Sequence, residues 1–159
     1  MSCLEPLLPA LARRLADIEP SRVLLVGSEA AALVHALRIP SEVRLEPLGA
    51  TPPADTPYDL ALVAGELRSA PAERLGVLAR LRDLYARRTL LLTGLEAAQS
   101  DTLEHASVMA LGFVHVDRYD YEGRSLRLYE FDIGTYKTTP DWLNSRDWAN
   151  PRLWDKYRW

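Results

Sequence analysis

Apolar residues along the chain form two patterns that alternate, short uninterrupted runs and repeats at helical spacing. Uninterrupted runs are typical of strands that are buried on both faces of a parallel sheet. They predict strands at 22–27, 58–64 and 89–93, with a shorter strand at 42–46. Apolar residues at helical spacing predict helices over 4–19, 29–39, 69–88 and 101–112. This alternation predicts an α/β fold with a mostly parallel sheet flanked by helices.

The last part of this pattern predicts a β-hairpin. Residues 113–121 and 125–133 are two β-rich runs, and Gly123 lies in the turn between them. Asp101 and Glu104 have the spacing of a capping box at the start of the preceding helix. In the helix before that, Leu81, Leu84 and Tyr85 are expected to face the sheet, and the arginines to face outward. The sheet should therefore end in an antiparallel edge.

Composition indicates one domain and excludes several kinds of site. The chain has 159 residues, 48% of them hydrophobic, which is enough for one core. No apolar run approaches the roughly 20 residues that cross a bilayer, and no signal peptide is evident, so we expect a cytoplasmic protein without membrane contact. Cys3 is the only cysteine, and the three histidines lack the spacing of a zinc or hydrolase motif. No metal site is expected.

Four segments carry a resemblance to a known family. They are Val23-Leu-Leu-Val-Gly27, Glu46 at the end of the second strand, Tyr58-Asp-Leu-Ala-Leu62 in the central strand, and Leu111-Gly-Phe113 before the hairpin. Their order resembles the class I S-adenosylmethionine (SAM) methyltransferases over about residues 20–135. The resemblance implies a Rossmann-like sheet with helices on both faces and SAM as the cofactor. We expect a domain at 1–135 and a separate extension at 136–159.

The cofactor loop departs from the pattern of that family. The family pattern has an acidic residue in the first strand and then G-x-G-x-G, whereas this chain has Leu25, Glu29 and Ala31 in place of the acid and the last two glycines. Only Gly27 remains. Glu29 is either part of the loop or a favourable charge at the following helix. Glu46 is either a partner for the ribose hydroxyls or a solvated acid at a strand end.

Catalytic residues cannot be assigned from the motifs. The end of the central strand reads Leu62-Val-Ala-Gly-Glu66 and lacks the [D/N]-P-P-aromatic motif of amino-group methyltransferases. Glu66 is either a group that reaches a ligand or a polar residue of a turn. The sequence therefore favours a non-catalytic binding or assembly module, with no cofactor assigned. The alternative is a divergent SAM-dependent methyltransferase that binds the cofactor through Gly27, Glu29, Glu46 and Glu66.

The extension contains every tryptophan of the chain. Trp142, Trp148, Trp154 and Trp159 lie among basic and aromatic residues, and residues 136–159 carry five bases and three acids. Such a segment can dock on its own domain, bind a protein partner, or stack on the bases of single-stranded nucleic acid. These three alternatives stay open. The last of them predicts an RNA-associated protein.

Overall fold

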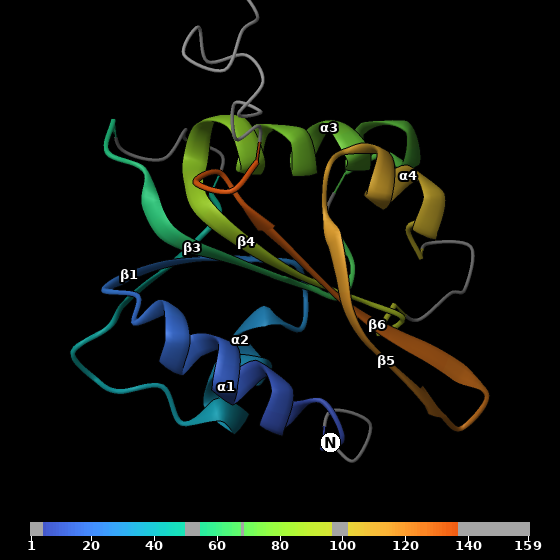
Figure 1. Ribbon diagram of the computed structural model, residues 1–159, viewed down its shortest axis with the longest axis horizontal. Coiled ribbons are helices and arrows are strands. Elements are labelled where there is room, and N and C mark those ends of the chain that lie inside the picture. The colour runs from blue at the N-terminus through green and yellow to red at the C-terminus, as the bar shows by residue number, and fades with distance from the viewer. Residues whose placement is uncertain (1–4, 50–54, 68, 97–101, 137–159) are drawn as a thin grey trace, which may run out of the picture.

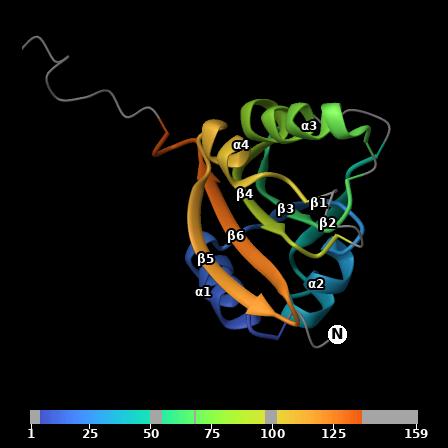
Figure 2. The same ribbon diagram turned by 90° about the vertical axis from the view of Figure 1, so that its right-hand side faces the viewer.

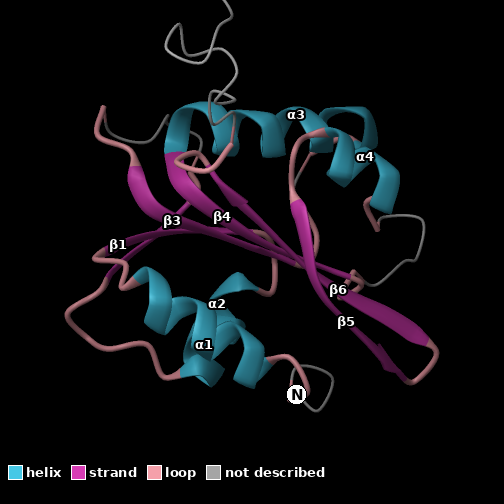
Figure 3. Ribbon diagram, in the orientation of Figure 1, coloured by secondary structure: helices cyan, strands magenta, loops and turns pink. Residues whose placement is uncertain are grey.

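A six-stranded sheet forms the centre of the molecule in the computed structural model, which describes residues 5–49, 55–67, 69–96 and 102–136. Helices α1 (Leu8–Ile18) and α2 (Ala30–Leu37) cover one face, and α3 (Arg74–Arg80) and α4 (His105–Ala110) cover the other (Figures 1 and 3). The strands are β1 (Arg22–Val26), β2 (Arg44–Pro47), β3 (Tyr58–Ala64), β4 (Ala86–Thr93), β5 (Val114–Tyr121) and β6 (Arg124–Asp132). This three-layer arrangement confirms the predicted α/β class.

The order of the strands in the sheet is β2-β1-β3-β4-β6-β5. Strands β1 to β4 are parallel, and β6 runs antiparallel to both β4 and β5. Figure 2 shows the β5–β6 hairpin along one side of the molecule. The structure therefore confirms a Rossmann-like, mostly parallel sheet that ends in an antiparallel hairpin.

Alternate residues of each strand supply two separate cores. In β3, Leu60 and Leu62 face α1 and α2, whereas Ala61 and Val63 face α3, and all four are at most 1% exposed. Leu7 and Leu11 close the first core from α1 at 0% exposure. Burial on both faces explains why the central strands read as uninterrupted apolar runs.

The helical segment before β4 ends earlier than its sequence predicts. A 3₁₀ turn (Pro71–Glu73), α3 and a π-helical turn (Leu81–Tyr85) follow one another, and β4 begins at Ala86. Arg87 and Arg88 thus lie in the strand, which corrects their predicted place on the helix. Leu81 is buried as expected, but Leu84 is 64% exposed. The wider π turn rotates Leu84 away from the sheet.

Two smaller predictions of element boundaries also need correction. Strand β2 begins at Arg44, two residues later than predicted. Helix α4 begins at His105, and the side chain of Glu104 makes no capping hydrogen bond. The predicted capping box is therefore wrong in its placement of Glu104, and its other member, Asp101, lies outside the described residues.

The tryptophan-rich segment 137–159 lies outside the described residues, and with it Trp142, Trp148, Trp154 and Trp159. The last described residue is Tyr136. Within the described ranges, no helix has both the length and the apolar character that a membrane crossing requires.

Candidate functional site

A pocket of ≈ 700 Å³ lies at the carboxyl ends of β1 and β2. The chain leaves β1 toward β2 on one side and later adds β3 on the other, so β1 and β3 flank a point where the strand order reverses. Open α/β sheets bind ligands in the crevice at such a point. This pocket is therefore the candidate functional site.

The side chains in the described lining of the pocket are uncharged and mostly apolar, whereas main-chain groups make much of its exposed surface polar. It consists of Leu25, Val26, Gly27, Ser28, Pro47, Leu48, Gly49, Leu67, Ser69 and Val77. Two serine hydroxyls are the only polar side-chain groups among these residues. Pockets for small molecules are commonly about 300–1,000 Å³, mostly apolar, with a few polar groups that fix orientation. The volume suits a small ligand, and the lining offers it apolar side chains together with polar main-chain groups.

Gly27 lies at the rim because two turns of the chain pack tightly there. Its φ is +96°, and a Cβ at this position would overlap the carbonyl oxygen of Ala64 at the end of β3. Gly65 has φ +78°, and a Cβ there would lie 2.5 Å from the hydroxyl of Ser28. Both positions need a residue that tolerates positive φ and has no side chain. The contact between the turns after β1 and β3 thus accounts for Gly27 without a ligand.

Hydrogen bonds join the same two turns. The Ser28 N–H donates to the Glu66 carbonyl at 3.1 Å, and the Glu29 N–H donates to the Ala64 carbonyl at 3.1 Å. The Glu66 N–H donates to the Ser28 hydroxyl at 3.0 Å. The amides of the turn after β1 are therefore bonded within the protein.

The structure brings Gly27, Glu29 and Glu66 together, but only Gly27 lines the pocket. Glu29 is half-buried beside Gly65 and precedes α2, where its side chain makes no capping hydrogen bond. Glu66 is exposed and lies outside the lining of the pocket. A cofactor role for either carboxylate stays a prediction.

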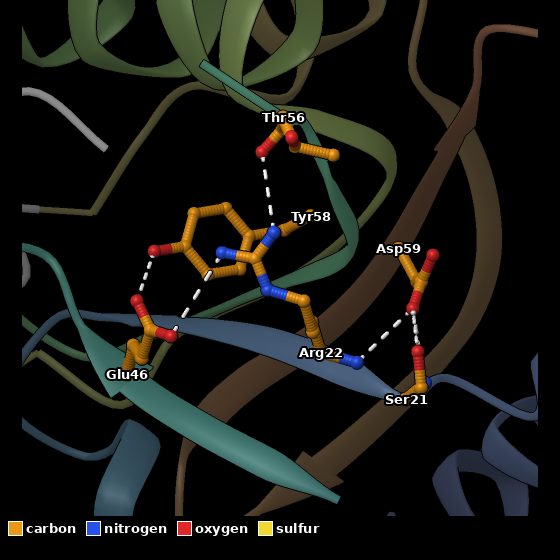
Figure 4. A network of polar contacts seen from close by, with 6 residues as sticks. All are labelled: Ser21, Arg22, Glu46, Thr56, Tyr58 and Asp59. Carbon is orange, nitrogen blue, oxygen red and sulfur yellow. Dashed lines mark hydrogen bonds and ion pairs between the residues drawn. The ribbon is translucent and has the colours of Figure 1, made fainter. Parts of the chain in front are cut away.

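Glu46, near the end of β2, takes part in a network with Arg22 and Tyr58, the first residues of β1 and β3 (Figure 4). Its carboxylate accepts a short hydrogen bond from the Tyr58 hydroxyl and lies 3.8 Å from Nη2 of Arg22. The Arg22 guanidinium lies over the Tyr58 ring, 4.5 Å from its centroid. The bond to Glu46, with burial as a smaller cause, raises the pKa of Tyr58. Pro47 and Leu48, not Glu46, form the pocket wall after β2, so the ribose role of Glu46 stays a prediction.

Asp59 organises the amino ends of β1 and β3, a role that sequence reasoning did not find. Its Oδ2 accepts hydrogen bonds from the Ser21 hydroxyl at 2.7 Å and from the N–H groups of Ser21 and Arg22 at 3.0 Å each. The hydroxyl bond is the main cause that lowers the pKa of Asp59. Its only sequence signal is an acid within an otherwise apolar strand.

Glu96 is a second carboxylate that the sequence did not single out. It follows β4, its side chain is 6% exposed, and its Oε2 accepts hydrogen bonds from the Gly94 N–H at 2.7 Å and the Thr102 hydroxyl at 3.1 Å. A smaller pocket of ≈ 350 Å³ adjoins it. Leu95 and Glu96 read as an ordinary turn in the sequence, because the donor from Thr102 comes from a later segment.

Two of the three histidines, His105 and His115, pack around Tyr129. Nδ1 of His105 lies 2.9 Å from the Tyr129 hydroxyl, and the His115 ring packs edge-on against Tyr129 at 5.4 Å between centroids. Across the described ranges, no three His, Cys, Asp or Glu side chains gather in a way that could hold a metal ion.

Comparison with known proteins gives a family match and several distant likenesses to solved structures. A sequence model described as "Family of unknown function (DUF6231)" matches residues 5–159, whereas no curated protein matches. The structure is similar to magnesium protoporphyrin IX methyltransferase from Synechocystis PCC 6803 with bound SAH, at 9% identity and a TM-score of 0.46, over 79% of this chain and 81% of that one. It is also similar to the methyltransferase domain of bacterial CtHen1-CN, at 10% identity and a TM-score of 0.47, over 79% and 97%. The family match includes the tryptophan-rich extension.

Proposed function

We propose that this chain, which belongs to the family of unknown function DUF6231, is a methyltransferase-like domain that serves as a binding module and transfers no methyl group. One observation carries the proposal. The described lining of the pocket at the switch point has no carboxylate: Glu29, Glu46 and Glu66 each adjoin a lining residue in sequence but lie outside the lining. The Glu46 carboxylate is bonded to Tyr58 and ion-paired with Arg22. SAM carries a sulfonium, an ammonium group and two ribose hydroxyls, for which a carboxylate is the natural partner.

The arrangement of the two turns supports the same proposal. The main-chain N–H groups of Ser28 and Glu29 are used in bonds to β3 and the residues after it. A ligand at this edge would therefore find few free donors from the loop that binds the cofactor in the family that the sequence resembles. Burial of an apolar group against Leu48, Leu67 and Val77 suits this lining better.

Calorimetric titration of the full chain with SAM and S-adenosylhomocysteine tests the proposal. We expect no saturable heat with either compound. Micromolar binding that weakens at least tenfold in Glu46→Gln would overturn the proposal, because it would assign the ribose hydroxyls to Glu46. Glu42→Gln is the matched control, since Glu42 is an exposed acid just before β2.

A divergent SAM-dependent methyltransferase is the second candidate, and the position and volume of the pocket favour it. A cavity of ≈ 700 Å³ at the switch point is large enough for a nucleoside-sized ligand. Binding of ribose by Glu46 would require its carboxylate to leave Tyr58. The titration above separates the two candidates.

We further propose that the tryptophan-rich extension docks on its own domain. Tyr136, where the extension begins, packs on Phe131 with 5.0 Å between ring centroids, and the Arg82 guanidinium lies 5.6 Å from the Tyr136 ring centroid. Because β6 ends opposite the start of β4, Tyr136 lies at the amino side of the sheet. The strands span only about 26 Å from there to the carboxyl edge, and 23 residues follow Tyr136, which is ample length.

The two other hypotheses are that the extension binds a protein partner and that it binds single-stranded RNA. An electrophoretic mobility shift with an unstructured oligonucleotide at low salt distinguishes the RNA alternative, because binding through phosphate contacts would weaken steeply as salt is added. We expect no shift. A shift that disappears in Trp148→Ala with Trp154→Ala would assign the extension to nucleic acid.

A further inference from the structure

The smaller pocket of ≈ 350 Å³ lies where β4 ends and the β5–β6 hairpin turns. We infer that it binds a small ligand through a carboxylate or phosphate group held by Arg124 and Arg127. No described residue lines both this pocket and the one at β1 and β2. The inference therefore goes beyond the proposed function and does not depend on it.

The pairing of β4 with β6 places the polar groups of this pocket on one face. Thr93 is directly opposite Arg127 in the antiparallel ladder, so their side chains project to the same side. Ser125 lies two residues before Arg127 and projects to that side too. All three residues line the pocket, together with Arg124 at the start of β6. With Thr102 and Glu96, which also line it, three hydroxyls, two guanidinium groups and one carboxylate border one small space.

Arg124 is held in place by the segment after β4. Its Nη1 donates to the main-chain carbonyl of Glu96 at 3.0 Å. Glu96 is 6% exposed, and its side chain accepts hydrogen bonds from the Gly94 N–H and the Thr102 hydroxyl, which hold Glu96 in place. Within the described part of the chain, no ion pair joins the Glu96 carboxylate to Arg124 or Arg127. The Arg124 guanidinium is therefore positioned before a ligand arrives.

Arg127 is half-buried, and the structure shows no ion pair or hydrogen bond from its side chain to any described residue. Its neighbour across the β5–β6 ladder, Arg118, is paired with Asp120 at 3.0 Å. Asp120 is near enough for the positive charge of Arg127 to act on its carboxylate, but no ion pair or hydrogen bond joins the two side chains. The planar fork of arginine matches the two oxygens of a carboxylate or phosphate. An oxyanion in the pocket would supply the directly hydrogen-bonded partner that Arg127 lacks.

Two acids near these arginines, Asp120 and Glu96, limit the charge of the ligand that the pocket can bind. The pKa of Asp120 is lowered mainly by its hydrogen bond from Arg118, with smaller contributions from the positive charges of Arg118 and Arg127. The volume lies near the lower limit of about 300 Å³ for ligand pockets, which indicates a small molecule. Glu96 at the wall disfavours a second negative charge close to the first.

A ¹H–¹⁵N NMR titration of the full chain with inorganic phosphate, and separately with acetate, at constant ionic strength tests the inference. We expect saturable shifts of the amides of Gly94, Gly123 and Ser125. Affinity should fall at least tenfold in Arg127→Gln and in Arg124→Gln. Arg44→Gln is the control and should bind the anions as the unaltered chain does. Arg44 is an exposed arginine on β2, the edge strand at the opposite end of the sheet from the hairpin.

The two probes identify the group that is bound. Saturation by phosphate alone indicates a phosphorylated ligand, and saturation by acetate alone indicates a carboxylic acid. Saturation by both indicates that the pocket binds an oxyanion of either kind. Absence of saturation with either anion would overturn the inference, as would equal affinity in Arg127→Gln and the unaltered chain. Arg127→Lys, which keeps the charge but loses the fork, provides a second variant with an expected intermediate affinity. None of these outcomes changes the result of the SAM titration.

Discussion

Gly27 matches a position of the cofactor motif, and a substitution there tests whether the packing of two turns requires the glycine. Its positive φ costs a non-glycine residue about 1–2 kcal/mol, and overlap with the Ala64 carbonyl should add about 1–3 kcal/mol. Gly27→Ala should therefore lower the free energy of unfolding in urea by about 2–5 kcal/mol. Gly76→Ala is the control, because Gly76 is helical with open space around it and should gain about 0.5–1 kcal/mol. Equal stability of Gly27→Ala and the unaltered chain would contradict the packing role.

Asp59 makes stability depend on pH at the acid end. Its pKa in the folded chain lies below the ordinary value of 3.8, chiefly because the Ser21 hydroxyl bonds the carboxylate. The stabilisation is thus fully present above about pH 4 and is lost as pH falls through the folded pKa. Asp59→Asn should lower the free energy of unfolding by about 1 kcal/mol at pH 7, and less at pH 3. Asp17→Asn, at an exposed position, should leave urea unfolding unchanged at both pH values.

At the scale of elements, the π turn after α3 decides which leucines stabilise the fold. Leu81 is 0% exposed and Leu84 is 64% exposed, although helical spacing predicts that both face the sheet. Leu81→Ala should lower the free energy of unfolding by about 2–4 kcal/mol, whereas Leu84→Ala should stay within about 0.5 kcal/mol. Urea unfolding followed by circular dichroism measures both. Similar losses of stability in the two variants would contradict this prediction, because they would indicate a regular α-helix that buries both leucines.

The strands could be predicted from the sequence better than the helix ends and the polar sites. Uninterrupted apolar runs mark β1 and β3 because both faces of the sheet are covered, and Gly123 marks the hairpin turn. The start of β4 was missed because Arg87 and Arg88 look helical, and only pairing across the sheet, such as Arg88 with Asp132 at 3.0 Å, places them in a strand. Long-range contacts of that kind are not encoded in local spacing.

The candidate site shows the same limit. Gly27 could be found as the residue after a buried strand, and it does line the pocket. The partners of Glu46 could not be predicted from the sequence, because Tyr58 and Arg22 come from two other strands. Glu96 and Arg127 have no motif at all, since their pocket forms only when the hairpin pairs with β4.

For the whole molecule, the position of the tryptophans allows the extension to be observed separately from the domain. All four lie at 142–159, so tryptophan fluorescence reports on the extension, while circular dichroism reports on the sheet and helices. If the extension docks on the domain, both signals should change together in urea, as coincident transitions do in two-state unfolding. Tyr136→Ala removes the contact with Phe131 at the start of the extension and should shift both transitions to lower urea. Tyr85→Phe, which keeps the ring, is the control. If the fluorescence is that of solvent-exposed tryptophan both before and after the circular dichroism transition, docking is rejected. The alternatives of a protein partner and of RNA then remain.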